Sequence, residues 1–465
     1  MLGATWITSL IVTRLDPVEE KGMGVPDLVS LRASCVLILL LLHGGGSLLG
    51  CHHTGHATPA PMTPGSSVAE TLRQHRALPD PDEKVWWEVS GPDMAWNNKN
   101  LHQIVPTVNV YRRGAVSELV VDEDPRIARF PVATSTGTLP YLQYLDSDES
   151  TTMGVVVLHR GRIVFEAYPR MQPQEKPIWW SVTKVMVSTV LAILEDQGRV
   201  DVSQPVEVYV PDLVGTDFEG VSVRHVLDMA SGVDCPDGDY SDRETCYMQF
   251  EASLGDAVRS EDSPDDPYSM LSSLNVGRWA PPGTGFDYSG VNTFVLGWVV
   301  ENVTGMPFQD ALSQMVWGRM GAESDASILA GRNGIPLTSG GLLANPRDMA
   351  RFGLLFTPSQ DRVTREPIVS ERYLEVILHG GDPALLRNGR WPYPVPDDVR
   401  HNVYQWDTVF ENDDIYKGGW AGQGLLINPR LDIVAVWVGY ASNDGRARPD
   451  PLAVLRNVLK GVYGP

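Results

Sequence analysis

Lysine is scarce in this chain of 465 residues, and cysteine is scarcer still. Only seven of the 37 basic residues are lysines, and there are four cysteines. No segment concentrates positive charge, and the formal net charge is -21. Nucleic-acid binding requires clustered Lys and Arg against the phosphates, so the sequence predicts no nucleic-acid partner. A lysine inside a chemical motif is correspondingly harder to attribute to chance.

Several catalytic and metal-binding patterns are also missing. The chain has no H-E-x-x-H segment and no cysteine–histidine cluster with zinc spacing. The acidic stretch from Asp234 to Cys246 lacks the glycine and the final glutamate of a calcium loop, which favours a solvated loop. With 43% apolar residues the chain can build a core without a metal. We therefore expect neither a metal nor a cofactor.

The N-terminal region has the composition of a targeting segment. Arg32 precedes an apolar run from Ala33 to Leu42, which is too short to span a bilayer. This pattern predicts a signal peptide over residues 1–50, with Met23 as a second candidate start. The next segment, residues 51–80, is rich in Pro, Gly, Ser and Thr and is expected to be a flexible tether.

The signal peptide ends in Leu-Leu-Gly before Cys51, which resembles a bacterial lipobox. We expect cleavage before Cys51 and lipidation of its thiol, giving a cell-envelope lipoprotein on the periplasmic or surface side. The lipid would be its only contact with a membrane. An ordinary secretory signal with cleavage elsewhere is the alternative.

Export gives a meaning to the two cysteines that follow Cys51. Cys235 and Cys246 are close in sequence, and in an oxidising compartment they could close the intervening loop by forming a disulfide. We expect a disulfide between them, with two free buried thiols as the alternative.

The distribution of apolar residues predicts an α+β fold. The segment Gly154 to Tyr168 is typical of a β-hairpin, and a second hairpin is expected around Asn428-Pro429-Arg430. Helical patterns dominate residues 200–335, and a helix closes the chain. We expect one domain over residues 81–465, an antiparallel sheet flanked by helices, with an inserted helical lobe at about 200–335.

A serine and a lysine stand three residues apart where a helix is expected to begin. Ser181 and Lys184 occur in "WWSVTK", ahead of an apolar run with helical spacing. On a helix they would share a face. A serine hydroxyl needs a neighbouring base to become a nucleophile, and a buried lysine with a lowered pKa can supply it. The motif is weak by itself.

Two later motifs strengthen it. "DYSG" places Tyr288 on a loop before a helix, and "YKGGW" places Lys417 at the expected start of a late strand. In this order the three motifs resemble the S-x-x-K, Y-x-N and K-T-G signature of serine β-lactamases and penicillin-binding proteins. Neighbouring phrases, among them "PPGTGFDYS" and "GGLLANPRDMARFGLL", resemble the class C-like branch, which includes esterases and 6-aminohexanoate-oligomer hydrolases. The resemblance implies the β-lactamase/transpeptidase fold.

The resemblance also implies a role for each motif residue. Ser181 would be the nucleophile that forms an acyl-enzyme, and Lys184 its base. Tyr288 would pass a proton to the leaving group, with a pKa lowered by two nearby lysines. The backbone N–H groups of Ser181 and Trp420 would form the oxyanion hole. Lys417 would supply positive charge to the substrate site.

The sequence departs from the family pattern at two substrate-binding positions. Gly290 stands where the family has Asn, and Gly418 stands where it has Thr or Ser. Both normally help to hold β-lactams and D-alanyl peptides. Gly419 matches the family and would allow close approach of the strand to the substrate.

These observations predict an exported serine hydrolase that cleaves amide or ester bonds of small molecules. A D-alanyl carboxypeptidase or a β-lactamase is the alternative enzyme. A non-catalytic penicillin-binding-like surface protein is the alternative outside catalysis, although such a protein has no need of Ser181, Lys184 and Tyr288 together. The sequence predicts no natural substrate and no oligomeric state.

Overall fold

The computed structural model describes residues 86–238, 240–391, 395–446 and 448–464. Contacts divide the chain into two units, Met1–Pro64 and Gly65–Pro465, and every described residue belongs to the second. The expected signal peptide, the lipidation site at Cys51 and the tether all lie outside the described residues.

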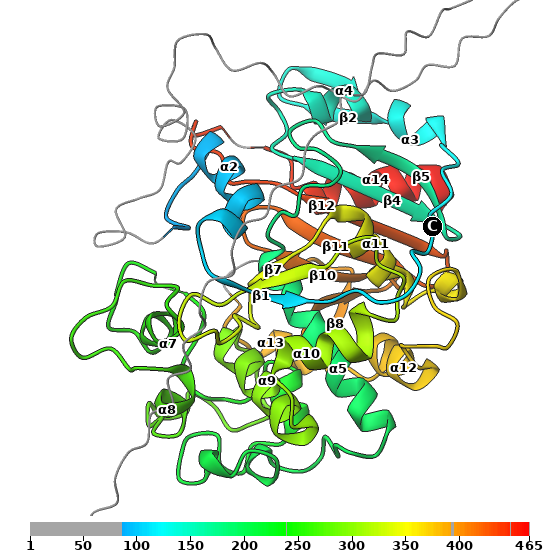
Figure 1. Cartoon of the computed structure of the whole chain (residues 1–465). Helices are drawn as coiled ribbons and strands as arrows, with labels where there is room; N and C mark the ends of the chain where they lie inside the picture. Colours follow the sequence, from blue (N-terminus) through cyan, green and yellow to red (C-terminus); the bar gives the residue numbers. More distant parts are fainter. Residues whose placement is uncertain (1–85, 239, 392–394, 447, 465) are drawn as a thin grey trace, which may run out of the picture. The chain divides into compact units, whose positions relative to one another are not determined.

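The centre of the domain is a seven-stranded antiparallel sheet with the order β5-β4-β12-β11-β10-β9-β8 (Figure 1). Its strands are β4 (Gly154–His159), β5 (Arg162–Ala167), β8 (Val399–Val403), β9 (Trp406–Phe410), β10 (Ile415–Gly419), β11 (Gln423–Asn428) and β12 (Ile433–Val438). The pairs β4–β5 and β11–β12 confirm the two predicted hairpins. Because β12 also pairs with β4, early and late parts of the chain meet in one sheet.

Two small sheets accompany the central one. The first has the order β1-β6-β7, and the second is the β2–β3 hairpin. Their strands are β1 (Thr107–Val110), β2 (Pro131–Thr134), β3 (Gly137–Pro140), β6 (Ala326–Leu329) and β7 (Leu342–Leu343).

Helices cover both faces of the central sheet. They are α2 (Pro92–Asn100), α3 (Pro125–Arg129), α4 (Tyr141–Asp146), α5 (Lys184–Asp196), α6 (Val223–Leu227), α7 (Cys246–Leu254), α8 (Pro267–Leu271), α9 (Gly290–Thr304), α10 (Phe308–Leu312), α11 (Pro346–Leu354), α12 (Glu371–His379), α13 (Pro383–Arg387) and α14 (Pro451–Tyr463). Short 3₁₀ or π turns are η1 (Leu101–Gln103), η2 (Trp180–Thr183), η3 (Val206–Val208), η4 (Pro211–Leu213), η5 (Ser313–Trp317) and η6 (Pro358–Arg362). The fold is α+β, as predicted.

The alternation of side chains along each strand divides the core between the two faces. In β4, Val155 and Val157 pack in a cluster with residues of α3, α4 and α14, while Val156 and Leu158 join the larger core with α5, α9 and α11. Successive strand residues point to opposite faces, so a strand that is apolar throughout is buried on both. Figure 1 shows α14 and α4 on one side of the sheet and α5 and α9 on the other.

The larger core extends into the segment for which helices were predicted. Between residues 200 and 335 the described chain forms α6 to α10 and also β6. α9 is buried along most of its length, and Gly305 ends it with φ 71°. Within this region the segment "VSVRHVLDMASGV" forms only the short helix α6, because Met229 has φ 56° shortly after its end.

Two predicted element boundaries near the motifs are wrong. α5 begins at Lys184, and Ser181 lies in the preceding turn η2. Trp180 has φ 47°, which an α-helix cannot include, so regular helix starts only after it. Lys417 is the middle residue of β10 and not its first, since the strand starts at Ile415, after a turn in which Asp413 has φ 67°.

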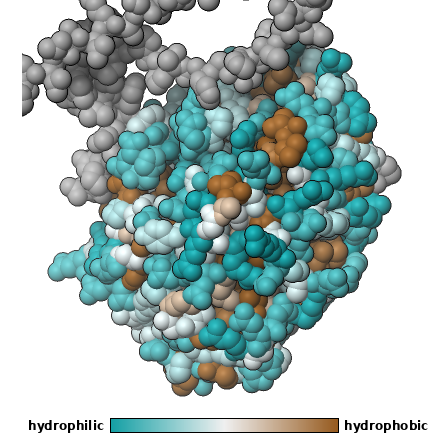
Figure 2. Space-filling view, turned by 45° about the vertical axis from the view of Figure 1, so that its right-hand side comes forward, coloured by the Kyte–Doolittle hydropathy of each residue, from teal (hydrophilic) through white to brown (hydrophobic). Residues whose placement is uncertain are grey.

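On the face drawn in Figure 2, hydrophobic residues form separate patches within a largely hydrophilic surface. Scattered exposed apolar residues of this kind are normal for a folded domain. Within the described ranges, no helix has the length and apolar character needed to cross a membrane.

Candidate active site

The turn that carries Ser181 is held by the residues before it. Trp179 is fully buried and donates its indole N–H to the Ala344 carbonyl at 2.8 Å. Trp180 then takes its positive φ of 47°, which is unusual for a bulky residue. Backbone strain of this kind occurs at functional sites when the surroundings enforce it. The turn leaves Ser181 partly exposed, directly before α5.

Lys184 is the first residue of α5 and is almost completely buried. Its Nζ lies 3.1 Å from Ser181 Oγ and donates to the Ser339 carbonyl at 2.7 Å. Burial lowers the pKa of Lys184 to about 8, and the positive charge of Lys417 adds to this while Asp237 opposes it. A substantial fraction of this amine is therefore neutral near pH 8 and able to accept the serine proton.

Tyr288 lies between the amino groups of two lysines. Its Oη accepts a hydrogen bond from Lys417 Nζ at 2.9 Å, and the nitrogens of Lys184 and Lys417 stand 4.9 and 4.7 Å from the ring centre. Burial, followed by the carboxylates of Asp407 and Asp237, nevertheless raises the pKa of this phenol well above its ordinary value. The expectation that two lysines lower it is wrong for the free enzyme.

The raised pKa of Tyr288 separates it from Lys184 in function. A phenol that keeps its proton can donate but cannot act as the first base, while a lysine whose pKa is about 8 can accept. Environments that push two pKa values apart in this way define the acid and the base of a site. Tyr288 has the properties of the acid, and Lys184 those of the base.

Lys417 is fully buried and paired with a carboxylate that the sequence did not single out. Its Nζ lies 2.5 Å from Asp407 Oδ1, and the other oxygen of Asp407 accepts the Gly418 N–H at 2.9 Å. Burial lowers the pKa of Lys417, and Asp407 opposes this shift. The ion pair thus favours a charged ammonium beside Tyr288.

Gly419 brings the end of β10 next to the Ser181 turn. A Cβ at this position would lie 2.5 Å from the Trp179 carbonyl oxygen and 3.1 Å from Trp180 Cβ. Only glycine fits so close to another backbone. The contact sets the following residue, Trp420, beside the nucleophile: its ring meets that of Trp180 edge-on at 5.0 Å.

The two departures from the family pattern coincide with space that other side chains occupy. A Cβ at Gly290 would lie 3.0 Å from the Tyr247 ring and 3.2 Å from Ser339 Cβ. A Cβ at Gly418 would lie 2.6 Å from Tyr416 Oη. Side chains of Asn or Thr would have to displace the buried Tyr247 or the partly buried Tyr416, so both glycines belong to the shape of this site.

Ser181 opens into a pocket with an empty volume of about 510 Å³. We call it the catalytic pocket; its lining residues are Trp87, Trp180, Ser181, Lys184, Asp237, Tyr240, Tyr247, Glu251, Asp256, Leu337, Ser339, Gly340 and Trp420. One wall is aromatic: Trp87 meets Tyr240 and Trp420 edge-on at 5.6 and 6.1 Å. The pocket thus combines π faces with carboxyl groups.

Two buried carboxyl groups, Glu251 and Asp256, form the acidic part of the catalytic pocket. Asp256 accepts the Trp86 indole N–H at 2.7 Å, whereas Glu251 Oε1 has no hydrogen-bond partner among the described residues. Burial raises the pKa of both groups, that of Asp256 to about 7, and the mutual repulsion of the pair adds to this for Glu251. The pair therefore retains a proton near neutral pH, and a nearby cation would favour its release.

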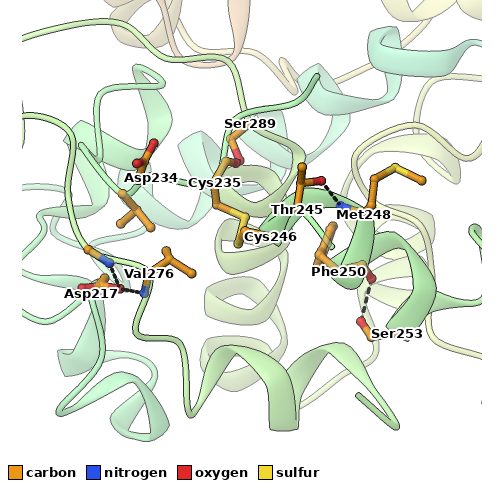
Figure 3. The surroundings of a disulfide bond; sticks show 12 residues. Asp217, Asp234, Cys235, Thr245, Cys246, Met248, Phe250, Ser253, Val276 and Ser289 are labelled. Carbon is orange, nitrogen blue, oxygen red and sulfur yellow. Dashed lines mark hydrogen bonds between the residues drawn. A yellow bond between two sulfur atoms is a disulfide. The ribbon is translucent and has the colours of Figure 1, made fainter. Parts of the chain in front are cut away.

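A disulfide joins Cys235 to Cys246 and closes the loop that carries Asp237 and Tyr240 (Figure 3). Ser289 Oγ donates to the Cys235 carbonyl at 2.6 Å, and Asp237 N donates to the Tyr288 carbonyl at 2.8 Å. The bridged loop is thereby tied to the segment that carries Tyr288.

The structure brings the predicted residues Ser181, Lys184, Tyr288, Lys417 and Trp420 into one site. Sequence reasoning missed the residues that complete it: Trp86, Trp87, Asp237, Tyr247, Glu251, Asp256, Ser339 and Asp407. Ser339 acts through its backbone carbonyl, which no motif could reveal. The carboxylates had one available signal, since Glu251 directly follows Phe250 and Asp407 directly follows Trp406, and a charge beside large apolar residues requires an explanation.

Comparison with known proteins agrees with this geometry. The β-lactamase family model matches residues 143–457. The 6-aminohexanoate-dimer hydrolase of Paenarthrobacter ureafaciens is 31% identical over 364 residues, covering 77% of this chain and 88% of that protein.

Solved structures show the same fold. A Bacillus anthracis protein provisionally assigned as a 6-aminohexanoate-dimer hydrolase superposes with a TM-score of 0.68 at 21% identity, covering 81% of this chain and 95% of that one. A β-lactamase/D-alanine carboxypeptidase from Yersinia pestis gives 0.53 at 16% identity, covering 67% and 94%.

The chain belongs to the β-lactamase family. It is a serine hydrolase with the β-lactamase fold and is related to 6-aminohexanoate-dimer hydrolase.

Proposed function

We propose that this protein cleaves amide or ester bonds of small linear molecules through an acyl-enzyme on Ser181. The observation that carries the proposal is the 3.1 Å approach of the buried Lys184 amine to Ser181 Oγ. The partly neutral amine and the hydroxyl form a nucleophile with its base. Tyr288, held at 2.9 Å by Lys417, supplies the acid.

The reaction has two halves, formation of the acyl-enzyme and its hydrolysis by water. Lys184 is the base in both halves, and Tyr288 is the acid in the first. Neutral Lys184 accepts the Ser181 proton as Oγ attacks the carbonyl carbon, and the N–H groups of Ser181 and Trp420 stabilise the oxyanion. Tyr288 donates its proton to the leaving nitrogen or oxygen, leaving an acyl-enzyme, and the Lys184 ammonium restores that proton. Water then attacks the ester while neutral Lys184 accepts a proton from it, and the Lys184 ammonium gives that proton to Ser181 Oγ as the acid product departs.

The acidic part of the catalytic pocket suggests the kind of acyl group that enters. Glu251 and Asp256 are buried within it, and a buried carboxylate is stable when a cation faces it. The aromatic wall adds favourable contact with a cation. We propose a substrate whose acyl chain ends in an ammonium group, as in a linear ω-amino acid such as 6-aminohexanoate.

A panel of matched substrates tests this proposal. The p-nitroanilide and p-nitrophenyl ester of 6-aminohexanoate differ from those of heptanoate by a terminal ammonium in place of a methyl group. A hydrogen bond to a charged group contributes about 1.5–3 kcal/mol, so kcat/KM should favour the amino compounds about 10- to 100-fold. Glu251→Gln should remove most of this preference and leave the heptanoyl rate nearly unchanged.

The panel also separates the alternatives. Glu301→Gln is the control, because Glu301 is a partly buried carboxyl group that accepts a hydrogen bond from Tyr268 Oη at 2.7 Å outside the pocket; this variant should keep the preference. Nitrocefin should be turned over at least about two orders of magnitude less efficiently than the best linear substrate. Nitrocefin turnover faster than that of every linear substrate would identify a β-lactamase. Release of D-alanine from a D-alanyl peptide would identify a carboxypeptidase. Binding of these compounds without turnover would identify a penicillin-binding-like protein.

We further propose that the protein is exported and anchored by a lipid on Cys51. The support is the sequence "LLGC" after a short apolar run. The full-length chain should partition into detergent with a mature N-terminus at residue 51, and Cys51→Ser should appear in the aqueous phase. Cys35→Ser, which changes a cysteine inside the apolar run, should behave as the unchanged chain does. Identical processing and release of the Cys51 variant would refute lipidation.

A further inference from the structure

Asp407 is the one acidic side chain that contacts both Lys417 and the backbone of the strand carrying it, among the described residues. It lies on β9 next to Thr408, which pairs with Tyr416 on β10, the neighbour of Lys417. One carboxylate oxygen is 2.5 Å from Lys417 Nζ, and the other accepts the Gly418 N–H at 2.9 Å. The two contacts orient the carboxylate and Lys417 with respect to each other.

Lys417 has little freedom apart from this pair. It is fully buried and makes its second contact with Tyr288 Oη at 2.9 Å. A buried ammonium without a carboxylate would be costly to keep charged, so Asp407 is what allows Lys417 to remain a cation at this depth. A charged Lys417 can donate a hydrogen bond to Tyr288 Oη. Because the phenol oxygen then acts as an acceptor toward Lys417, its own proton is free to be donated to another group.

The bond from Gly418 N extends the effect of Asp407 to the backbone. Gly419, the next residue, is packed against the carbonyl of Trp179 so closely that a Cβ would lie 2.5 Å from that oxygen. The position of β10 at this point therefore determines where Trp420 stands relative to Ser181. Asp407 therefore affects both the environment of Tyr288, the proposed acid, and the shape of the site.

We propose that Asp407 is a positioning residue of this hydrolase: it holds the Lys417 ammonium against Tyr288 and fixes the end of β10 beside the Ser181 turn. This inference rests on the proposed acyl-enzyme function. It assigns to Asp407 no contact with the substrate.

The charge of Asp407 acts on three titrating neighbours from three elements. It raises the pKa of Lys184 on α5, of Lys417 on β10 and of Tyr288 before α9. Asp237, from the bridged loop, acts on them in the same sense and is unchanged in the test below. Tyr416 also faces this charge, and burial raises its pKa well above the range of the test.

On one further side, Asp407 faces only uncharged residues. It borders a small cavity that is otherwise lined by Phe286, Leu386, Trp391, Val395, Pro396 and Thr408. Loss of the carboxylate charge should therefore move all three pKa values downward together. The acidic limb, where Lys184 must lose its proton, and the alkaline limb, where Lys417 and Tyr288 must keep theirs, both move to lower pH.

The experiment is the pH profile of kcat/KM for wild type, Asp407→Asn and Asp407→Glu, with a p-nitrophenyl ester as substrate. Removing one opposite charge at this distance should shift the alkaline limb of Asp407→Asn by about one pH unit or more to lower pH and reduce its maximum at least about tenfold. Asp407→Glu keeps the charge and should keep the wild-type pH optimum, whatever its maximal rate.

Asp414→Asn is the matched control. Asp414 is another buried carboxylate beside β10, and it pairs with Arg456 at 2.9 Å away from the pocket. It should lower the melting temperature without moving the pH optimum. If Asp407→Asn loses activity at an unchanged optimum, or Asp407→Glu shifts the optimum as much as Asn does, Asp407 is only structural and the proposal is overturned. Absence of activity in wild type would instead overturn the proposed function. If Asp407→Asn does not fold, the profile of Asp407→Glu alone decides.

Discussion

Ser181→Ala is expected to abolish turnover and covalent labelling by a fluorophosphonate probe. Only an activated serine attacks phosphorus quickly, and Ser181 is the hydroxyl that lies 3.1 Å from the Lys184 amine. Loss of the nucleophile should lower kcat by about four orders of magnitude or more, because the acyl-enzyme route is closed. Intact-mass spectrometry after incubation with the probe, together with ester hydrolysis rates, measures both effects.

The matched control for this variant is Ser188→Ala. Ser188 lies one helical turn beyond Lys184, is fully buried and binds Tyr373 Oη at 3.1 Å rather than the pocket. It should label and turn over as wild type does, apart from any loss of stability. Equal labelling of wild type and Ser181→Ala would show that another residue reacts and would remove Ser181 from the mechanism.

Lys184→Met is expected to reduce kcat/KM by about 10³-fold or more, because serine and lysine act as one unit. Only the neutral amine accepts the serine proton, so activity of wild type should rise with pH up to about 8, where burial places the pKa of Lys184. Below that pH the rate should fall about tenfold per unit. Methionine fills the volume but has no base, so the residual activity should lose this acidic limb.

Lys184→Arg and Lys99→Met complete the experiment. Arginine stays protonated and should be as inactive as methionine. Lys99 is a partly buried lysine whose Nζ donates to the carbonyl of Arg170 at 2.9 Å, and neither residue lines the catalytic pocket. Its replacement should leave the pH profile unchanged. If Lys184→Met retains more than about a tenth of wild-type kcat/KM, another group is the base and the mechanism above is wrong.

Part of this site could be predicted because its signals are local. Ser181 and Lys184 are three residues apart, and the order of the Tyr288 and Lys417 motifs completes a pattern that is specific only in combination. The hairpins β4–β5 and β11–β12 were predictable for the same reason, since each joins two apolar runs through a short turn.

The ends of elements were predicted less well than their existence. The sequence "WWSVTK" suggested a helix from Ser181, but Trp180 has a positive φ, Ser181 lies in the 3₁₀ turn η2, and α5 begins at Lys184. That conformation depends on the burial of Trp179 and its bond to Ala344, 165 residues later in the chain. A local pattern contains no information about such a contact.

By itself, then, the sequence determined the α+β class, the candidate nucleophile with its candidate base, and the missing side chains at Gly290 and Gly418. Only the tertiary structure decided how these groups behave. Burial lowers the pKa of Lys184 and raises that of Tyr288, although both sequence motifs look equally polar. Trp86 donates a hydrogen bond to Asp256, 170 residues later in the chain, and so holds one of the carboxyl groups that line the catalytic pocket. The physical reason is that pKa values, pocket shape and the pairing of Asp407 with Lys417 depend on which distant residues exclude water from a site, and only folding brings those residues together.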